Sequence, residues 1–381
     1  EIMDEWVKKY GKVFGYFIGW RPTLMVADLD LIKQILVKDS HIWINRPKLA
    51  MKAVPVTDCL VGLRGQRWKD VRSLLMSTFS ASKMRLVTGL MNEKIDELIQ
   101  IISDISSKGL PVEAWKTYQA MTLDTITHTA LAMKTNCQRE QENDEFFMSV
   151  KAFLKNAVNP AVRLALYFPV IASIMCFISD KLAYSGRMSS IIMRNLREVM
   201  ALRRKDLSVK NIDLLQAMLE VSEVSEISKA TPERTEMDGY RLVEGRQMKL
   251  LTDMEIIANA WVFLLGGFET TANSITYTSY LLAMHQEVQE KLYQEVMSII
   301  QDHSSHIGYD DIAKMTYLDQ VFSESLRVIT PVVLFISREA GQDTKLGDIF
   351  IPKDMKVFIP LWTLHHDPEQ WPNPDVFDPE R

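Results

Sequence analysis

The stretch TDMEIIANAWVFLLGGFETTANSI, residues 252–275, decides the fold class. It has the pattern of a long helix, and two glycines followed by polar residues interrupt that pattern near the middle of the helix. Thr252 and Glu255 have the spacing of a capping box, in which the hydroxyl and the carboxylate each accept a backbone N–H of the first turn. Helical spacing continues to about His285. A helix of that size would be roughly 50 Å long at 1.5 Å per residue, enough to cross a whole domain.

The centre of this helix combines residues of low helix propensity with polar residues. Gly266 and Gly267 would each cost about 1 kcal/mol relative to alanine, and polar Glu269, Thr270 and Thr271 follow directly. Adjacent glycines let a flat group approach the backbone, and threonine hydroxyls can bind carbonyls that a local widening of the helix frees. A carboxyl group beside a hydroxyl can also pass a proton. A simple kink with a satisfied polar patch is the alternative.

The rest of the chain predicts a mainly α-helical protein with small β-sheets contributed from both ends. Long helical patterns run from 67 to 205, a hairpin pattern covers 13 to 27, and strand-like runs return near 347 to 361. Residues 222 to 250 are polar with charges of both signs, which favours an exposed loop. No internal repeat is present, and we interpret residues 1–381 as a single domain.

Composition narrows the function classes. Hydrophobic residues make up 47% and charged residues 24% of the 381 residues, as in a well-cored globular protein. The net charge of −5 argues against a nucleic-acid partner. Cys59, Cys137 and Cys176 lie far apart without a CxxC pair, so we expect three reduced thiols and no zinc site.

The most apolar stretch is NPAVRLALYFPVIASIMCFI, residues 159–178. A transmembrane helix needs about 20 nearly uninterrupted apolar residues, and Pro160, Arg163 and Pro169 interrupt this one. Three interpretations stay open: a true span, a buried helix–loop–helix, and a surface that dips into a membrane interface.

Two residue pairs have a helical spacing. Glu324 and Arg327 stand three residues apart in an apolar helix, which indicates a shared face, and a surface pair is the alternative. Trp68 and Arg72 stand one turn apart and also share a face. A partly exposed pair is the alternative there.

The segments WKDVR (68–72), GGFETT (266–271), ESLR (324–327) and DPER (378–381) occur in the order of, and resemble, motifs of the cytochrome P450 family. The resemblance implies the cytochrome P450 fold and bound haem. It places Gly266 and Gly267 beside the haem. It implies that Glu269 and Thr270 deliver protons to dioxygen, and that Trp68 and Arg72 bind a haem propionate.

The same resemblance suggests further roles with weaker support. Arg46, in WINRP, and Arg338, in ISREA, match positions of additional propionate-binding arginines. Guanidinium groups suit the carboxylates of a porphyrin. The family locks its Glu–Arg pair with a later arginine, and Arg381 matches that residue, so Glu324, Arg327 and Arg381 are expected to form a structural ion-pair network.

The resemblance also implies an iron-ligating cysteine in an FxxGxRxCxG loop shortly after the DPER motif. None of the three cysteines has that context. We therefore expect the ligand to lie beyond Arg381, in a longer chain of which this is a fragment truncated at the C-terminus, lacking an N-terminal anchor, the cysteine loop and the last helix. The alternative is a non-catalytic, haem-free fragment or pseudoenzyme.

Residues 336–381, which include SREAGQD and LHHDPEQWPNPDVFDPER, are similar to the animal microsomal group that contains the 3A subfamily and thromboxane synthase. This similarity implies haem b, dioxygen, a lipophilic substrate and electrons from NADPH through NADPH–cytochrome P450 reductase. It also implies attachment to the endoplasmic reticulum membrane, on the cytosolic face, with residues 159–178 at the membrane surface.

The helix centre bears on the reaction. Monooxygenases of the group need proton delivery, whereas thromboxane synthase rearranges an endoperoxide and has aliphatic residues in place of the threonines. Because this sequence keeps Glu269, Thr270 and Thr271, it favours monooxygenation, with endoperoxide isomerisation as the alternative.

Candidate substrate contacts flank the expected haem. They lie in the loop from 54 to 60, one turn before the glycines, and after the Glu–Arg helix. Simple core packing is the alternative for each. The candidates in the last two groups are Phe263, Leu264, Val332, Val333, Leu334 and Phe335. An apolar cavity of this kind would take lipophilic molecules.

Overall fold

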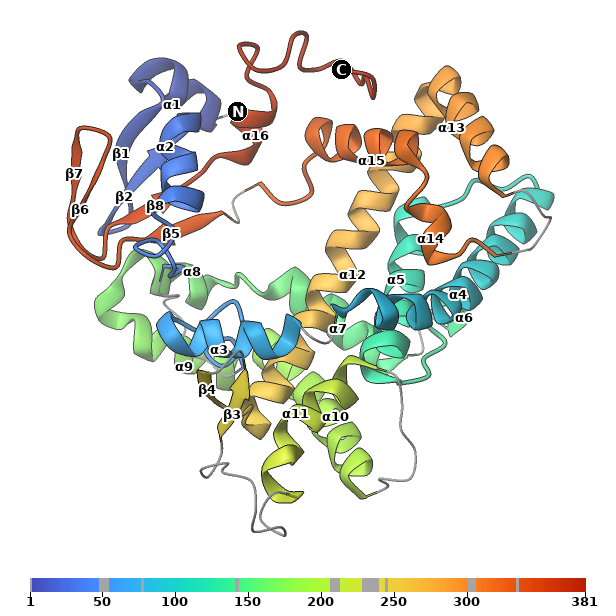
Figure 1. Cartoon of the computed structure of the whole chain (residues 1–381), viewed down its shortest axis with the longest axis horizontal. Helices are drawn as coiled ribbons and strands as arrows, with labels where there is room; N and C mark the ends of the chain where they lie inside the picture. Colours follow the sequence, from blue (N-terminus) through green and yellow to red (C-terminus); the bar gives the residue numbers. More distant parts are fainter. Residues whose placement is uncertain are drawn as a thin grey trace.

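A computed structural model of the chain describes residues 2–47, 55–76, 79–140, 144–205, 213–227, 240–243, 246–300, 306–333 and 336–381. It is mainly helical with small β-sheets, which confirms the predicted fold class. The sheet region stands beside a helical body that α12 crosses obliquely (Figure 1).

The α-helices have the following bounds: α1 (Ile2–Tyr10), α2 (Leu29–Lys33), α3 (Gly65–Met76), α4 (Ala81–Ser107), α5 (Ala114–Leu131), α6 (Cys137–Glu140), α7 (Glu145–Asn156), α8 (Pro160–Tyr167), α9 (Ala172–Lys181), α10 (Tyr184–Lys205), α11 (Leu214–Ile227), α12 (Asp253–Met284), α13 (Gln286–Ile299), α14 (Tyr309–Ile312), α15 (Thr316–Val328) and α16 (Leu361–His365). A π-helical turn, η1 (Gln34–Lys38), follows α2, and a 3-10 turn, η3 (Pro169–Ile171), joins α8 to α9.

The strands are β1 (Val13–Ile18), β2 (Arg21–Val26), β3 (Tyr240–Val243), β4 (Arg246–Lys249), β5 (Ser337–Glu339), β6 (Thr344–Leu346), β7 (Ile349–Ile351) and β8 (Lys356–Phe358). The main sheet has the order β1-β2-β8-β5. β2 pairs with β8 in parallel, with Leu24 opposite Val357. The two ends of the chain therefore build one sheet, as the sequence predicted.

α12 begins as its sequence predicts. The Thr252 hydroxyl accepts a hydrogen bond from the Glu255 amide at 3.2 Å, and the Glu255 carboxylate accepts one from the Thr252 amide at 2.9 Å. Burial alone would raise the pKa of Glu255, but hydrogen bonds from Arg67 and Thr252 outweigh it and lower that pKa. Arg67 lies on α3 and also donates to the Leu250 carbonyl at 2.8 Å. This contact ties α3 to the beginning of α12.

The prediction of an exposed loop over 222 to 250 was wrong in part. α11 continues to Ile227, and β3 and β4 form an antiparallel hairpin in which Tyr240 faces Lys249. Two short runs separated by two residues that include Gly245 have the spacing of a tight hairpin. The mixed charges obscured this signal. Residues 228–239 lie outside the described part of the chain.

The apolar stretch 159–178 forms α8, η3 and most of α9. One side is buried, including Val162 and Ala165, while Val170, Ile174 and Phe177 are exposed. Among the described residues, no helix has both the length and the apolar character to cross a membrane.

The turn between β1 and β2 rests on the end of α8. The Trp20 amide donates to the Tyr167 carbonyl at 3.2 Å, and the Trp20 ring meets Phe168 edge to face with centroids 5.7 Å apart. Gly19 has a φ of +60°, and a Cβ there would lie 2.2 Å from the Tyr167 carbonyl oxygen. Glycine is therefore required at this close approach.

We predict that Gly19→Ala lowers the free energy of unfolding by about 1–3 kcal/mol, because it adds both backbone strain and a clash with α8. Gly15→Ala is the matched control in the same hairpin, since a Cβ at Gly15 would meet no atom within 4 Å. Urea denaturation of both variants measures the difference. Equal stability of the two would contradict the docked turn.

Candidate functional site

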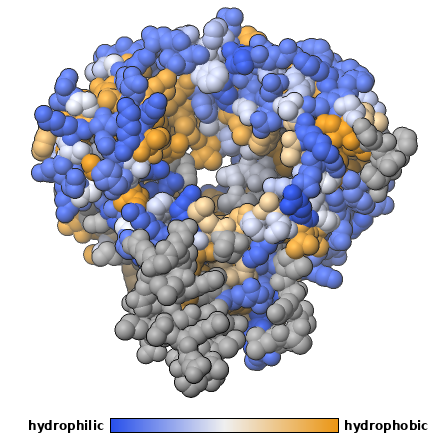
Figure 2. Space-filling view, viewed as in Figure 1, coloured by the Kyte–Doolittle hydropathy of each residue, from blue (hydrophilic) through white to orange (hydrophobic). Residues whose placement is uncertain are grey.

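The middle of α12 is open on one side. Gly266 is exposed although it lies at the centre of a 32-residue helix, and a Cβ there would meet nothing within 4 Å. A Cβ on Gly267 would instead lie 2.7 Å from the Ile126 side chain of α5. Gly267 thus lets α5 approach closely, whereas Gly266 leaves free space. The space-filling view is hollowed in its middle (Figure 2).

Hydroxyl groups satisfy the carbonyls around this opening. Thr270 Oγ donates to the Gly266 carbonyl, and Thr122 Oγ of α5 donates to the Phe268 carbonyl at 3.2 Å. The helix nevertheless remains α-helical from Asp253 to Met284. The expected local widening is absent from it because the hydroxyls supplement the backbone bonds and do not replace them.

Glu269 lies on the side of α12 that faces α5 and α7. Its carboxylate accepts a hydrogen bond from Gln119 Nε2 of α5 at 3.0 Å. Burial raises the pKa of Glu269, while the Gln119 hydrogen bond and the charge of Lys151 on α7 oppose that rise. The effect of desolvation is larger than the two opposing effects, so the carboxyl holds a proton more readily than an exposed glutamate would. Sequence reasoning missed Gln119, because nothing in its local pattern marks it.

A cavity of about 560 Å³ collects basic side chains from separate segments of the chain. Arg46 follows η1, Trp68 and Arg72 come from α3, and Arg338 comes from β5. The Arg72 guanidinium lies over the Trp68 ring, 5.5 Å from its centroid. The structure therefore brings all four of these sequence-predicted residues to one cavity.

The electrostatics of this cavity favour a bound anion. Burial lowers the pKa of Arg46, and the nearby charge of Arg338 lowers it further. Burial likewise lowers the pKa of Arg338. Two guanidinium groups that repel one another would be stabilised by carboxylates, which arginine binds through paired hydrogen bonds. The residues present thus fit a group that carries two carboxylates.

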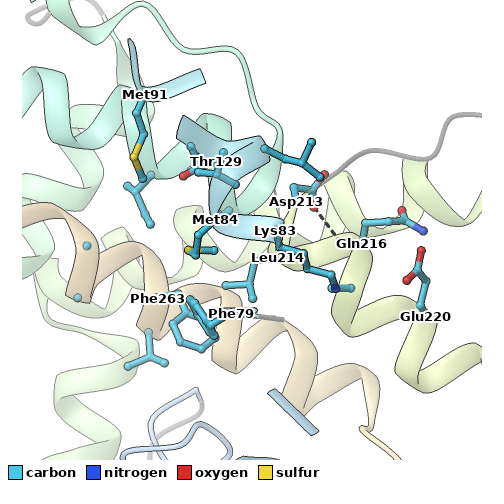
Figure 3. A pocket seen from close by; sticks show the side chains of 18 residues that line it. Phe79, Lys83, Met84, Met91, Thr129, Asp213, Leu214, Gln216, Glu220 and Phe263 are labelled. Carbon is cyan, nitrogen blue, oxygen red and sulfur yellow. Dashed lines mark hydrogen bonds between the residues drawn. The ribbon is translucent and has the colours of Figure 1, made fainter. Parts of the chain in front are cut away.

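A second cavity, of about 570 Å³, lies between α4, α5, α11 and α12 and has mostly apolar walls (Figure 3). Gly266, Gly267 and Phe263 belong to its lining. The Phe263 ring lies against Phe79, with centroids 5.5 Å apart. Polar groups such as Asp213 stand at its edge.

The structure places Leu264 differently from Phe263. Its side chain is fully buried in the hydrophobic core and does not line this cavity. One residue along a helix turns the side chain by about 100°, so Phe263 and Leu264 cannot both face the same space. Val332 is half-buried and Val333 is exposed, and neither lines the two cavities. Leu334 and Phe335, like residue 54, lie outside the described residues.

The three cysteines are free and buried. Burial raises the pKa of the Cys59 and Cys137 thiols, which keeps them protonated. Neither they nor Cys176 line the two cavities. A thiolate for a metal therefore does not come from these three residues.

Glu324 is the centre of a buried ion-pair network. Its carboxylate accepts two hydrogen bonds of 2.7 Å from Arg327 and one of 3.0 Å from Arg381 Nε. Arg327 also donates to the carbonyls of His365 and Pro374 at 2.8 Å. The network joins α15 to the segment that ends at Arg381.

A helical body with a bare glycine at its centre and an arginine-lined cavity indicates a haem-binding protein. Comparison with known proteins gives the family: the model described as Cytochrome P450 matches residues 1–381. The chain belongs to the cytochrome P450 family. At this level it is a haem monooxygenase, an oxidoreductase.

The similarity to individual proteins agrees with this family assignment. Cytochrome P450 3A56 of Fundulus heteroclitus is 30% identical over 99% of this chain and 72% of its own length. Human cytochrome P450 3A5 is 30% identical over 99% of this chain and 71% of its own length. Thromboxane-A synthase of Rattus norvegicus is 30% identical over 98% of this chain and 72% of its own length.

We predict that Glu324→Ala lowers the free energy of unfolding by about 3–5 kcal/mol, because it leaves the buried Arg327 guanidinium without its carboxylate and also removes the partner of Arg381. Glu380→Ala is the matched control in the same region, since Glu380 forms an exposed ion pair with Lys291 that contributes little. Guanidinium chloride denaturation measures both. A loss no larger for Glu324→Ala than for the control would contradict the buried network.

Proposed function

We propose that this chain is the greater part of a haem-thiolate monooxygenase that inserts one oxygen atom of dioxygen into a lipophilic substrate. The observation that carries this proposal is the opening at Gly266, which has the Thr270 hydroxyl and the Glu269 carboxyl beside it on the next turn of α12. NADPH–cytochrome P450 reductase supplies electrons from NADPH in this proposal. Residues 1–381 form a single domain of the enzyme.

Haem b fits the residues of the site. Arg46, Trp68, Arg72 and Arg338 would bind its propionates, and Gly266 would leave room for its face. When bound, a haem with a thiolate ligand supplies the redox chemistry that cleaves dioxygen. The proposal requires an axial cysteine other than Cys59, Cys137 and Cys176, which are buried elsewhere.

The protein's own part is proton delivery and the exclusion of water. Thr270 has a hydroxyl that both donates and accepts, and it is fixed by its bond to the Gly266 carbonyl. Glu269 holds a proton more readily than usual because it is partly desolvated. Glu269 lies on the α5 side of the helix and would pass its proton to the neighbouring Thr270 hydroxyl, which is bonded to the Gly266 carbonyl. Phe263 and the segment of Val332 and Val333, with Leu334 and Phe335, are the proposed substrate contacts.

An endoperoxide isomerase is the second candidate, because the chain is as similar to rat thromboxane-A synthase as to the 3A relatives. Such a rearrangement uses neither external electrons nor delivered protons. The half-buried Glu269 beside Thr270 would then have no function. The polar centre of α12 therefore favours monooxygenation over isomerisation.

We also propose attachment to the cytosolic face of the endoplasmic reticulum membrane. Val170, Ile174 and Phe177 are exposed on the η3–α9 side, and exposed Phe17 and Trp20 belong to the hairpin that rests on α8. An exposed apolar patch of this kind is stabilised by insertion into the interfacial region of a bilayer.

For the reaction, we predict that Thr270→Ala lowers the product formed per NADPH consumed severalfold and raises peroxide release, because protons no longer reach dioxygen in the right order. The haem-loaded full-length protein is assayed with the reductase. Thr276→Ala is the matched control, since Thr276 makes the same type of bond to a carbonyl one turn back, at 2.7 Å. Unchanged coupling in Thr270→Ala would refute proton delivery. A full-length protein that forms no CO complex on reduction would favour the haem-free alternative, and a CO complex without the Soret shift would refute thiolate ligation.

For the membrane, we predict that Phe177→Ser weakens partition onto phosphatidylcholine vesicles about tenfold, because a buried phenylalanine contributes about 1.5–3 kcal/mol. Tyr280→Ser is the control, since Tyr280 is equally exposed but lies near the end of α12. Vesicle flotation measures the bound fraction. Equal losses for both variants would contradict this surface.

A further inference from the structure

Gln119 is a buried neutral amide at the contact between α5 and α12. It is 1% exposed, and the surrounding residues of the α5–α12 contact include fully buried Leu123 and Phe268. Burying an amide costs free energy unless its polar atoms are hydrogen-bonded. A buried amide in a packed interface therefore needs a hydrogen-bond partner that offsets the cost of its burial.

The amide nitrogen has such a partner. Gln119 Nε2 donates to Glu269 Oε2 at 3.0 Å. Gln119 Oε1 is buried and has no hydrogen-bond partner among the described residues. Rotation of the terminal amide by 180° exchanges the two atoms at almost no steric cost. The same side chain can therefore offer Glu269 either an N–H or a carbonyl oxygen.

This property distinguishes Gln119 from a cation. A lysine or arginine at this position would stabilise only the ionised carboxylate. An amide can donate to the carboxylate and, after rotation, accept from the carboxylic acid. Both protonation states of Glu269 then keep a hydrogen bond to α5.

The other effects on the pKa of Glu269 oppose one another. Burial favours the protonated form, and the charge of Lys151 on α7 favours the ionised form. Lys151 is held over the rings of Trp115 and Phe147, 5.6 and 5.7 Å from their centroids. It acts on the carboxylate through its field and not through an ion pair, so it does not fix Glu269 in one state.

We propose that Gln119 is a positioning residue for proton delivery, whose rotating amide holds the Glu269 side chain in place through both halves of a protonation cycle. In each cycle Glu269 takes one proton from water and releases one toward the Thr270 hydroxyl. The amide gains and loses no proton; it exchanges only the atom that it presents. This inference rests on the monooxygenase function proposed above.

The test replaces Gln119 with methionine, which has nearly the same shape and neither donor nor strong acceptor. Gln138→Met is the matched control: Gln138 is also buried, donates to the Lys94 carbonyl at 3.0 Å, and has a buried Oε1 without a partner among the described residues. It lies at α6, away from Glu269. Gln119→Leu is a second variant in case the methionine variant folds poorly.

The first measurement does not depend on turnover. The protonated carboxyl of Glu269 is followed by infrared difference spectroscopy over a pH series, as the C=O band that Glu269→Gln removes. Loss of Gln119 removes a hydrogen bond from both protonation states, but the bond to the charged carboxylate is about twice as strong as the bond to the neutral acid, so the midpoint should rise by about one pH unit. Gln138→Met should leave the midpoint in place. An unshifted midpoint in Gln119→Met overturns the proposal.

The second measurement links the amide to the reaction. In the haem-loaded full-length protein, Gln119→Met should lower the product per NADPH severalfold at unchanged KM, and the pH profile of turnover should move upward. If Thr270→Ala disrupts coupling while Gln119→Met does not, the positioning function is wrong and the monooxygenase proposal stands. If neither Thr270→Ala nor Glu269→Gln changes coupling, the proposed function itself fails.

Discussion

The structure depends on one helix that must stay continuous while one side of its centre stays bare. Gly266 provides the bare surface and lowers the helix propensity at the centre of α12. Contacts outside that turn compensate for the stability that the helix loses there. The capping box at Thr252 and Glu255 fixes the beginning of the helix, and Gly267 lets α5 support its middle. Because Glu255 also pairs with Arg67, the helix that is expected to bind a propionate is anchored to the same cap.

Two groups of charged residues differ in how their charges are stabilised. Glu324 has its carboxylate saturated by two arginines, so it acts as a rigid joint between α15 and the segment around Pro374. Arg46 and Arg338 lie close enough for one to lower the pKa of the other. A buried network that is complete rigidifies a fold, whereas charges of one sign in a cavity are stabilised by a ligand of the other sign. The contrast is consistent with a structural function for Glu324 and with the proposed propionate binding by Arg46 and Arg338.

Local signals in the sequence predicted the elements that local physics controls. The capping box at Thr252, the β1–β2 hairpin and the three-residue spacing of Glu324 and Arg327 each involve neighbours in sequence. What the local signals did not show depended on a distant partner. The significance of Gln119 appears only when α5 lies against α12.

The polar centre of α12 also bears on which reaction the site can serve. A leucine or methionine at position 119 would fill the same space without the cost of a buried amide, but it would leave the Glu269 carboxylate without its donor. An aliphatic residue at 269 would remove the need for both. An enzyme that only rearranges its substrate would gain stability from that simpler arrangement. The joint presence of Thr270, Glu269 and Gln119 therefore makes physical sense where the carboxyl must change its protonation state during turnover, which is the requirement of a monooxygenase.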